Sequence, residues 1–254
     1  MEWTDEGILL SSQSHGETSS IVTLLTATHG RHAGMVAGGQ GRRKSPLLQA
    51  GNHLMVRWRA RLADHLGSLT LEMITPTVAP WLGDPEILAL IASATSVTEA
   101  SLPERQPMRA LYAGLAALFA LEEKALWGPA YVRWEMGLLQ TLGYGLDMSC
   151  CALSGAKEGL AYISPRTGRA VTEAAAEPYI DKLLPLPGFM CGAPDWNDED
   201  ILKGLDLTGH FLSHHVFAHP QNRRLVPVDG MLPLARQRVA SFYQNRVNST
   251  AVVA

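Results

Sequence analysis

The sequence lacks several features that would assign it quickly to a class of protein. Three cysteines are too few for a disulfide framework or for the four ligands of a cysteine zinc site, so we expect free, buried thiols. The longest apolar run, residues 110–121, is too short to span a bilayer, and the acidic start is not a signal peptide. We therefore expect a soluble, cytoplasmic protein.

The sequence also lacks the common catalytic motifs. No Gly-Lys dipeptide is present for a P-loop, and Gly39-Gln40-Gly41 lacks the third glycine of a dinucleotide fingerprint. No Gly-x-Ser-x-Gly elbow occurs, and no pair of carboxylates stands in an apolar setting. We therefore expect a protein that is not an enzyme and that needs no cofactor.

One histidine cluster is the exception to this pattern. His210, His214, His215 and His219 lie on one predicted helix, where the i, i+4 spacing can share a metal ion. No glutamate stands between the first pair to act as a general base. A partly exposed face near the end of a helix explains the cluster more simply, since histidine is favourable there. A metal-dependent hydrolase that uses His210, His214 and His215 stays an alternative.

Acidic residues are missing from one long segment. Residues 18–63 contain no Asp or Glu, although the whole chain has a net charge of −3. A local field of one sign is what a surface for a polyanion needs. The segment contains these positive residues: Arg31, Arg42, Arg43, Lys44, Arg57, Arg59 and Arg61.

The first eighty residues show the pattern of short strands. Apolar and β-branched stretches with period-2 faces alternate with Gly-containing turns, which indicates a small closed β-barrel of the OB type. The expected strands are residues 7–11, 21–26, 31–37, 52–62 and 68–74.

The strand over residues 52–62 has two different faces. Leu54, Val56, Trp58, Ala60 and Leu62 share the face that we assign to the core. Met55, Arg57, Arg59 and Arg61 share the other face. Alternate residues on a strand are roughly 6.5–7 Å apart, a step that suits neighbouring phosphates of a flexible nucleic-acid strand. A solvated strand face is the alternative, but no acid lies nearby in the sequence to pair with these arginines.

A glycine-rich loop adds further positive charge. Residues 38–41 contain three glycines, which predicts a mobile loop, and Arg42, Arg43 and Lys44 follow directly. The row and the loop together predict a groove and a flap for nucleic-acid backbone, and Arg31 stands at the start of the strand that leads to the loop. An interaction scaffold that binds an acidic protein partner instead of DNA stays a second alternative.

The sequence pattern changes from strand-like to helix-like after Pro76 and Pro80. Capping residues and apolar stripes predict helices over residues 84–96, 101–124, 128–143, 197–219 and 233–245, with a hairpin over 162–171. We therefore predict an α+β protein in which residues 1–80 form the DNA-binding barrel. Residues 81–254 form an α-helical bundle on the barrel, with an irregular insertion over 147–195.

Several short motifs, in this order and spacing, resemble the RecO family of bacterial recombination mediators. They include Gly16-Glu17-Thr18-Ser19, the basic loop 36–45 and Arg133-Trp134-Glu135, and they end with residues 142–147, Leu-Gly-Tyr-Gly-Leu-Asp. Many members carry a four-cysteine zinc knuckle after the Leu-Asp. Here Cys151 matches the first ligand, Ser154 stands at the second, and the pair expected after Gly168 is missing. A zinc-finger-like insertion without metal is therefore expected.

The resemblance implies a function as well as a fold. Members bind single- and double-stranded DNA, anneal complementary strands, and assist recombinase loading on strands coated by single-stranded-DNA-binding protein. The implied partners are RecR and the acidic, apolar C-terminal tail of that coating protein. Arg133 stands where a family arginine lies near the tail site, and a salt bridge to an acid of the bundle is the alternative role for it.

Overall fold

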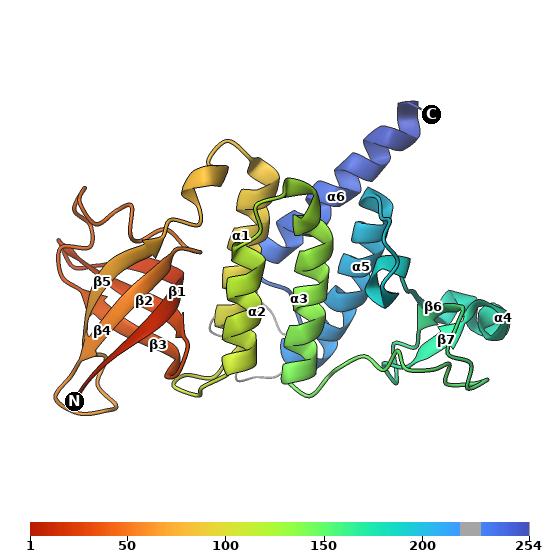
Figure 1. The fold of residues 1–254 in the computed structure, drawn as a ribbon, viewed down its shortest axis with the longest axis horizontal. Helices are drawn as coiled ribbons and strands as arrows, with labels where there is room; N and C mark the ends of the chain where they lie inside the picture. The colour runs from red at the N-terminus through yellow and green to blue at the C-terminus, as the bar shows by residue number, and fades with distance from the viewer. Residues whose placement is uncertain (219–229, 254) are drawn as a thin grey trace. The chain divides into compact units, whose positions relative to one another are not determined.

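The computed structural model describes residues 1–218 and 230–253, with side chains described to residue 250. The chain forms two compact units, Met1–Lys124 and Ala125–Ala254 (Figure 1). The first unit contains five strands and two helices, and the second contains the remaining helices and a small sheet. The division predicted at residue 80 stays a prediction.

The five strands of the first unit form a closed barrel with the order β1-β2-β3-β5-β4. All neighbours are antiparallel except β3 and β5, which close the barrel in parallel. A five-stranded barrel with this order confirms the predicted OB type and the α+β class. The strands are β1 Glu2–His15, β2 Ser19–Thr26, β3 Gly30–Val36, β4 His53–Arg59 and β5 Ser68–Thr75.

Alternation along the strands fills the barrel. On β4, Leu54, Val56 and Trp58 point inward and are at most 2% exposed, as predicted. They pack with Leu9, Val22, Leu24, Val36 and Leu69 from the other strands. The predicted strand over 52–62 extends three residues too far at its carboxyl end, because β4 ends at Arg59. Leu62 is therefore not in the core, and its side chain is 52% exposed.

Two helices complete the first unit. Helix α1, Pro85–Ser101, begins as predicted: Asp84 caps it by accepting hydrogen bonds from the backbone N–H groups of Glu86 and Ile87. It packs against β1 and β2. It runs five residues beyond the predicted end, so the predicted start of the next helix at residue 101 is wrong. A short 3-10 turn, Ala79–Trp81, precedes α1, and helix α2, Arg109–Phe119, follows it.

Helices α3, α5 and α6 form the body of the second unit. Asn197 and Asp200 form a capping box at the start of α5, as the sequence predicts. A π-helical turn, Leu212–Val216, follows α5, and the predicted continuation to His219 lies outside the described residues. The helices are α3 Trp127–Thr141, α5 Asp198–Phe211 and α6 Leu234–Val253.

The insertion between α3 and α5 is more regular than predicted. It contains a three-stranded sheet with the order β7-β6-β8, and the predicted hairpin at 162–171 is confirmed by β6 and β7. Cys151, Val171 and Ala176 form its small core. Its elements are β6 Leu160–Ile163, β7 Ala170–Thr172, α4 Glu173–Ala176, β8 Leu184–Pro185 and two 3-10 segments, Glu177–Lys182 and Gly188–Cys191.

None of the described helices is both long enough and apolar enough to cross a membrane.

Candidate nucleic-acid interface

Three loops meet at the carboxyl end of β3. Val36 pairs with Ser20, just after the β1–β2 turn, and Met35 pairs with Ser68, just after the β4–β5 loop. The β3–β4 connection, residues 37–52, begins at the same point. OB barrels bind oligonucleotides with the β2–β3 face and the loops beside it. We therefore name these three loops, residues 16–18, 37–52 and 60–67, the rim loops.

Gln40 ties two of the rim loops together. Its side-chain Nε2 donates hydrogen bonds to the carbonyls of Gly16 (3.0 Å) and Ser19 (2.9 Å). Its backbone N–H donates to the carbonyl of Thr18 (3.1 Å). Gly39 is buried beside Ser20, where a Cβ atom would lie 2.6 Å from the Ser20 hydroxyl oxygen. The loop predicted to be mobile is therefore a series of turns that is fastened at its base.

The basic residues of this loop differ in their exposure. Arg42 and Arg43 are exposed, and neither forms an ion pair with a residue that the structure describes. Lys44 is half-buried, and its Nζ donates to the carbonyl of Ala37 at 2.6 Å. Arg42 and Arg43 are thus available to an anion, whereas Lys44 partly serves to close the loop.

The predicted arginine row on β4 is only partly confirmed. Arg57 and Arg59 point outward and are exposed, as predicted. Arg61 lies beyond the end of the strand, in the loop 60–67, and is exposed there. Barrel closure also places Glu2 of β1 beside β4, where it forms an ion pair with Arg57.

The outer face of β4 therefore carries charges of both signs. Glu2 and Glu6 on β1 and Glu72 on β5 stand on this face, as the pairings of Arg59 with Glu2 and of Met55 with Glu6 and Glu72 show. No acid lies near these arginines in the sequence, but barrel closure supplies one for Arg57. Arg59 has no ion-pair partner among the residues described in the structure.

Arg31 has structural partners on the same unit. Its Nε donates to the carbonyl of Leu102 at 2.8 Å, and its guanidinium lies 3.7 Å from the carboxylate of Glu104. Its side chain is only 15% exposed. It joins β3 to the connection between α1 and α2, so we leave it out of the proposed contact surface.

Trp58 lies in the core, as predicted, and belongs to an aromatic cluster that the sequence did not reveal. Trp3 pairs with Trp58 across β1 and β4, and their rings stack at 5.6 Å. His29 stacks on the other side of Trp3 at 4.1 Å. His32 meets both tryptophans edge-on at 5.0 Å, and both of its buried ring nitrogens lack a hydrogen-bond partner. Burial, reinforced by the positive charge of Arg105, lowers the pKa of His32 to about 4.

The histidine cluster does not form a metal site among the described residues, where no group of three His, Cys, Asp or Glu could hold an ion. His210 and His214 stack at 4.1 Å, and Nδ1–H of His214 donates to the carbonyl of His210. His215 stacks instead on Tyr144 and Phe211. This arrangement does not favour a hydrolase, and His219 lies outside the described part of the chain.

The cysteines are free and occupy three different environments. Cys151 is buried, whereas Cys150 is half-buried and Cys191 is exposed, so the prediction of buried thiols is wrong for Cys191. The Cys151 sulfur accepts hydrogen bonds from the backbone N–H groups of Ser154 and Thr172, both at 3.4 Å. Burial alone would raise the pKa of this thiol, but hydrogen bonds from the side chains and backbone N–H groups of Ser154 and Thr172 outweigh it and lower the pKa to about 6.

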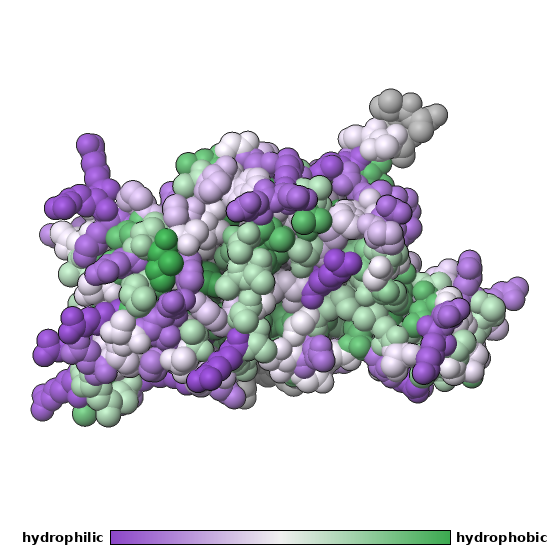
Figure 2. Space-filling view, in the orientation of Figure 1, coloured by the Kyte–Doolittle hydropathy of each residue, from purple (hydrophilic) through white to green (hydrophobic). Residues whose placement is uncertain are grey.

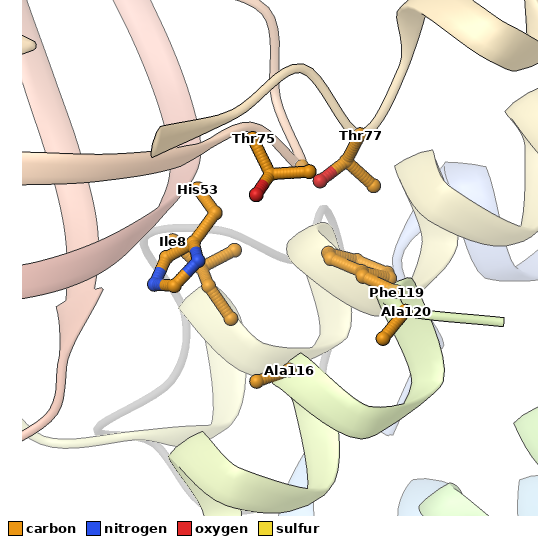
Figure 3. A pocket seen from close by; sticks show the side chains of 8 residues that line it. Ile8, His53, Thr75, Thr77, Ala116, Phe119 and Ala120 are labelled. Atoms are coloured by element: carbon orange, nitrogen blue, oxygen red, sulfur yellow. The ribbon is translucent and has the colours of Figure 1, made fainter. Parts of the chain in front are cut away.

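A small cavity lies in the first unit, between the barrel and α2 (Figure 3). Figure 3 shows Ile8 and His53 on one side, Phe119 and Ala120 on the other, and Thr75 and Thr77 above them. Its volume is about 70 Å³. Sites for small organic ligands usually measure roughly 300–1,000 Å³. The cavity therefore does not indicate a cofactor site.

Arg133 lies on α3 in the second unit. Its guanidinium donates to the carbonyl of Phe189 at 2.7 Å and lies over the Phe189 ring, 5.7 Å from the centroid. The residue is exposed, and it forms no ion pair with a described acid. The alternative role in a salt bridge of the bundle is therefore not what the structure shows.

Comparison with known proteins identifies the family. The family described as "Recombination protein O N terminal" matches residues 1–77, and that described as "Recombination protein O C terminal" matches residues 82–224. The chain belongs to the RecO family. A RecO protein of Rhodospirillum centenum, named "DNA repair protein RecO", is 50% identical over 99% of this chain and 98% of its own length. The RecO proteins of Caulobacter sp. strain K31 (48% identical, over 89% of this chain and 94% of that protein) and Rhodospirillum rubrum (46%, over 94% of each) carry the same name.

Proposed function

We propose that this RecO-family protein is a non-catalytic mediator that binds single- and double-stranded DNA and anneals complementary strands. One observation carries the proposal: four exposed arginines on and beside the rim loops have no acidic partner among the described residues. These arginines, named here the basic rim, are Arg42, Arg43, Arg59 and Arg61.

The basic rim has the chemistry that annealing needs. Guanidinium groups bind phosphates through charge-assisted hydrogen bonds and carry no sequence preference when they contact the backbone alone. Each phosphate contact on a single strand releases about 0.7 of a counterion, so binding weakens steeply with salt. Two strands whose phosphates are neutralised on one surface repel each other less, which favours their pairing.

We extend the proposal to partners on the basis of the RecO family resemblance. Recombinase loading on coated strands requires contact with the coating protein, whose acidic tail would place a carboxylate on Arg133. The bond from Arg133 to the Phe189 carbonyl holds the guanidinium in one orientation and leaves other N–H groups for that carboxylate. We also propose RecR as a partner and the cytoplasm, where the bacterial chromosome lies, as the place of action.

Strand annealing and DNA binding by matched variants test the main proposal. The triple variant R42A/R43A/K44A and the double variant R59A/R61A should anneal more slowly and bind single strands less tightly. The triple variant should also make the salt dependence shallower by about 1.4 counterions, since about 0.7 is released per contact and Arg42 and Arg43 supply two contacts. The control R109A/R238A removes two other exposed arginines and should behave like the wild type.

The results distinguish this proposal from an interaction scaffold. A wild-type protein that binds neither single- nor double-stranded oligonucleotides at low salt would contradict DNA binding and favour an acidic protein partner. For the tail, Arg133→Ala should lose binding to a peptide with an acidic, apolar C-terminus, while Arg238→Ala should keep it. Equal binding by both variants would remove Arg133 from the site.

A further inference from the structure

The loop between β4 and β5 exposes two leucine side chains to solvent. The side chains of Leu62 and Leu66 are 52% and 40% exposed. Sequence alternation assigns Leu62 to the core, but the strand ends at Arg59 before the pattern does. An apolar side chain kept outside the core forgoes the stabilisation that burial would give it. The arrangement therefore requires a loop that is held in this conformation.

Arg105, in the connection between α1 and α2, holds the middle of the loop. Its guanidinium donates to the carbonyls of Asp64 (3.2 Å) and His65 (3.0 Å) and also to that of Ala63. Arg105 itself has a φ of 60°, the only described residue other than glycine with positive φ. A left-handed conformation costs a non-glycine residue energy, so contacts elsewhere must stabilise it.

The carboxyl end of the loop is fastened as well. The Trp58 indole N–H donates to the carbonyl of Leu66 at 2.9 Å, and the Met35 backbone N–H donates to the carbonyl of Gly67 at 3.0 Å. Gly67 has a φ of 68° and lies so close to Trp58 that a Cβ atom would stand 2.4 Å from the indole nitrogen. The loop is thus built against the barrel, and its leucines point outward from a fixed backbone.

The charges around these leucines indicate which partner fits. Arg59 precedes the loop and Arg61 lies within it, both exposed and both part of the basic rim. The loop also carries one acid, Asp64. Figure 2 shows hydrophobic and hydrophilic residues side by side on the barrel end that includes the N-terminus. An apolar ridge flanked by arginines complements a polyanion that also presents apolar faces, and an unstacked nucleic-acid strand is such a ligand.

We propose that Leu62 and Leu66 contact the bases of single-stranded DNA while Arg59 and Arg61 bind its phosphates. Leucine side chains can insert between neighbouring bases and keep them unstacked. Bases held in this way stay accessible for pairing with a second strand. The inference rests on the proposed function, since it adds base contacts to a surface that binds phosphates.

Two serine substitutions and an exposed-leucine control test the inference. The variants are L62S, L66S and L62S/L66S, and the control is L82S, whose leucine is 62% exposed on the same unit. Binding of a single-stranded oligonucleotide is measured by fluorescence anisotropy at several salt concentrations. Each substitution should weaken binding about fivefold, as expected for half the burial of a leucine. The salt dependence should not change, because the phosphate contacts remain.

A second readout reports on the bases themselves. An oligonucleotide with 2-aminopurine, which fluoresces more when unstacked, should brighten on binding to the wild type and to L82S but not to L62S/L66S. The variant L62F should bind severalfold more tightly, because an aromatic ring stacks better on a base than leucine does.

The outcomes separate this inference from the proposed function. A wild type that binds no DNA overturns both. A wild type that binds, with L62S/L66S equal to it in affinity and in 2-aminopurine signal, overturns the base contacts alone. Loss of self-association in L62S/L66S with unchanged DNA binding would assign the leucines to a second copy of the chain and would also overturn the inference.

Discussion

The guanidinium of Arg57 on β4 forms an ion pair with the carboxylate of Glu2 on β1. Both side chains reach solvent, with exposed fractions of 64% and 38%. Exposed ion pairs stabilise a fold by only about 0–1 kcal/mol. The pair therefore matters more for the electrostatic field on this face of the barrel than for its stability.

Replacing Glu2 should strengthen DNA binding. In Glu2→Gln, Arg57 loses its partner and becomes available to a phosphate, so the salt dependence of single-strand binding should steepen by about 0.7 of a counterion. Anisotropy titrations at several salt concentrations measure this slope. Glu123→Gln removes an equal charge from an exposed position outside the barrel strands of the same unit and serves as the control. Identical slopes for both variants would place Arg57 outside the DNA surface.

The sequence correctly predicts which β4 side chains face inward, but it does not predict which residues of neighbouring strands lie beside them. Leu54, Val56 and Trp58 face inward because period-2 hydrophobicity reports burial on one strand. The pairing of Arg57 with Glu2 depends on barrel closure, which joins residues 55 positions apart. Local pattern also does not mark where a strand ends, so it assigns Arg61 and Leu62 to a strand that ends at Arg59.

Side chains that position the site are harder to recognise than those that form it. Gln40 stands between glycines and carries no charge, yet it joins two rim loops through backbone carbonyls that no sequence pattern reveals. Arg105 stands far from the basic segment, and its role depends on the path of the chain after α1. Charge counting finds phosphate contacts, whereas positioning depends on tertiary hydrogen bonds.

Truncation of Gln40 should weaken DNA binding without unfolding the barrel. In Gln40→Ala the two hydrogen bonds of the side-chain amide are lost, each with a net value of about 0.5–1.5 kcal/mol. Only the backbone hydrogen bond to Thr18 then holds loop 37–52 to the β1–β2 turn, so the loop is less well ordered. Arg42 and Arg43 then have to be ordered at each binding event, so affinity should fall severalfold. Gln13→Ala, which truncates another exposed glutamine on β1, provides the comparison. A Gln40→Ala protein that binds and anneals as fast as the Gln13→Ala protein would show that loop anchoring is irrelevant to binding.

His32 should make the first unit sensitive to mild acid. Its pKa in the folded protein is lowered from 6.5 to about 4, first by burial and then by the charges of Arg105 and His29. Between these values the unfolded chain binds a proton that the folded chain does not, so stability falls as pH decreases from 6.5 to 4. The loss should be of the order of 3 kcal/mol, from roughly 1.4 kcal/mol per pKa unit.

Urea unfolding at pH 7.0 and pH 5.0 measures this dependence. His32→Phe keeps an aromatic ring against the edges of Trp3 and Trp58 but cannot be protonated, so its stability should change less between the two pH values. The carboxyl of Asp5 should not contribute to the stability difference between pH 7.0 and pH 5.0. Burial acts to raise its pKa, but hydrogen bonds from His29 and Thr28 lower it below 3.8, so its contribution is lost only at more acidic pH. An equal acid sensitivity of the wild type and His32→Phe would assign the effect to other groups.

Arg236 and Glu135 form a fully buried ion pair in the second unit. Nε of Arg236 lies 2.5 Å from Oε1 of Glu135, and the hydroxyls of Tyr131 and Thr208 donate to the same carboxylate. Removing one member of such a pair leaves the other charged and buried, which costs about 3–5 kcal/mol. Arg236→Met should therefore strongly destabilise the second unit, whereas Arg238→Met, an exposed position on the same helix, should change its stability little.

The double variant Glu135→Leu/Arg236→Met distinguishes the ion pair from simple packing. Replacing both charges with apolar side chains removes the uncompensated carboxylate, so much of the stability lost in Arg236→Met should return. The recovery should be incomplete, because the hydroxyls of Tyr131 and Thr208 each lose the carboxylate as an acceptor, and a lost hydrogen bond costs about 0.5–1.5 kcal/mol. Urea unfolding of the single and double variants measures these differences. A double variant no more stable than Arg236→Met would mean that the arginine stabilises the unit by its packing and its bond to the Leu205 carbonyl, not by its charge.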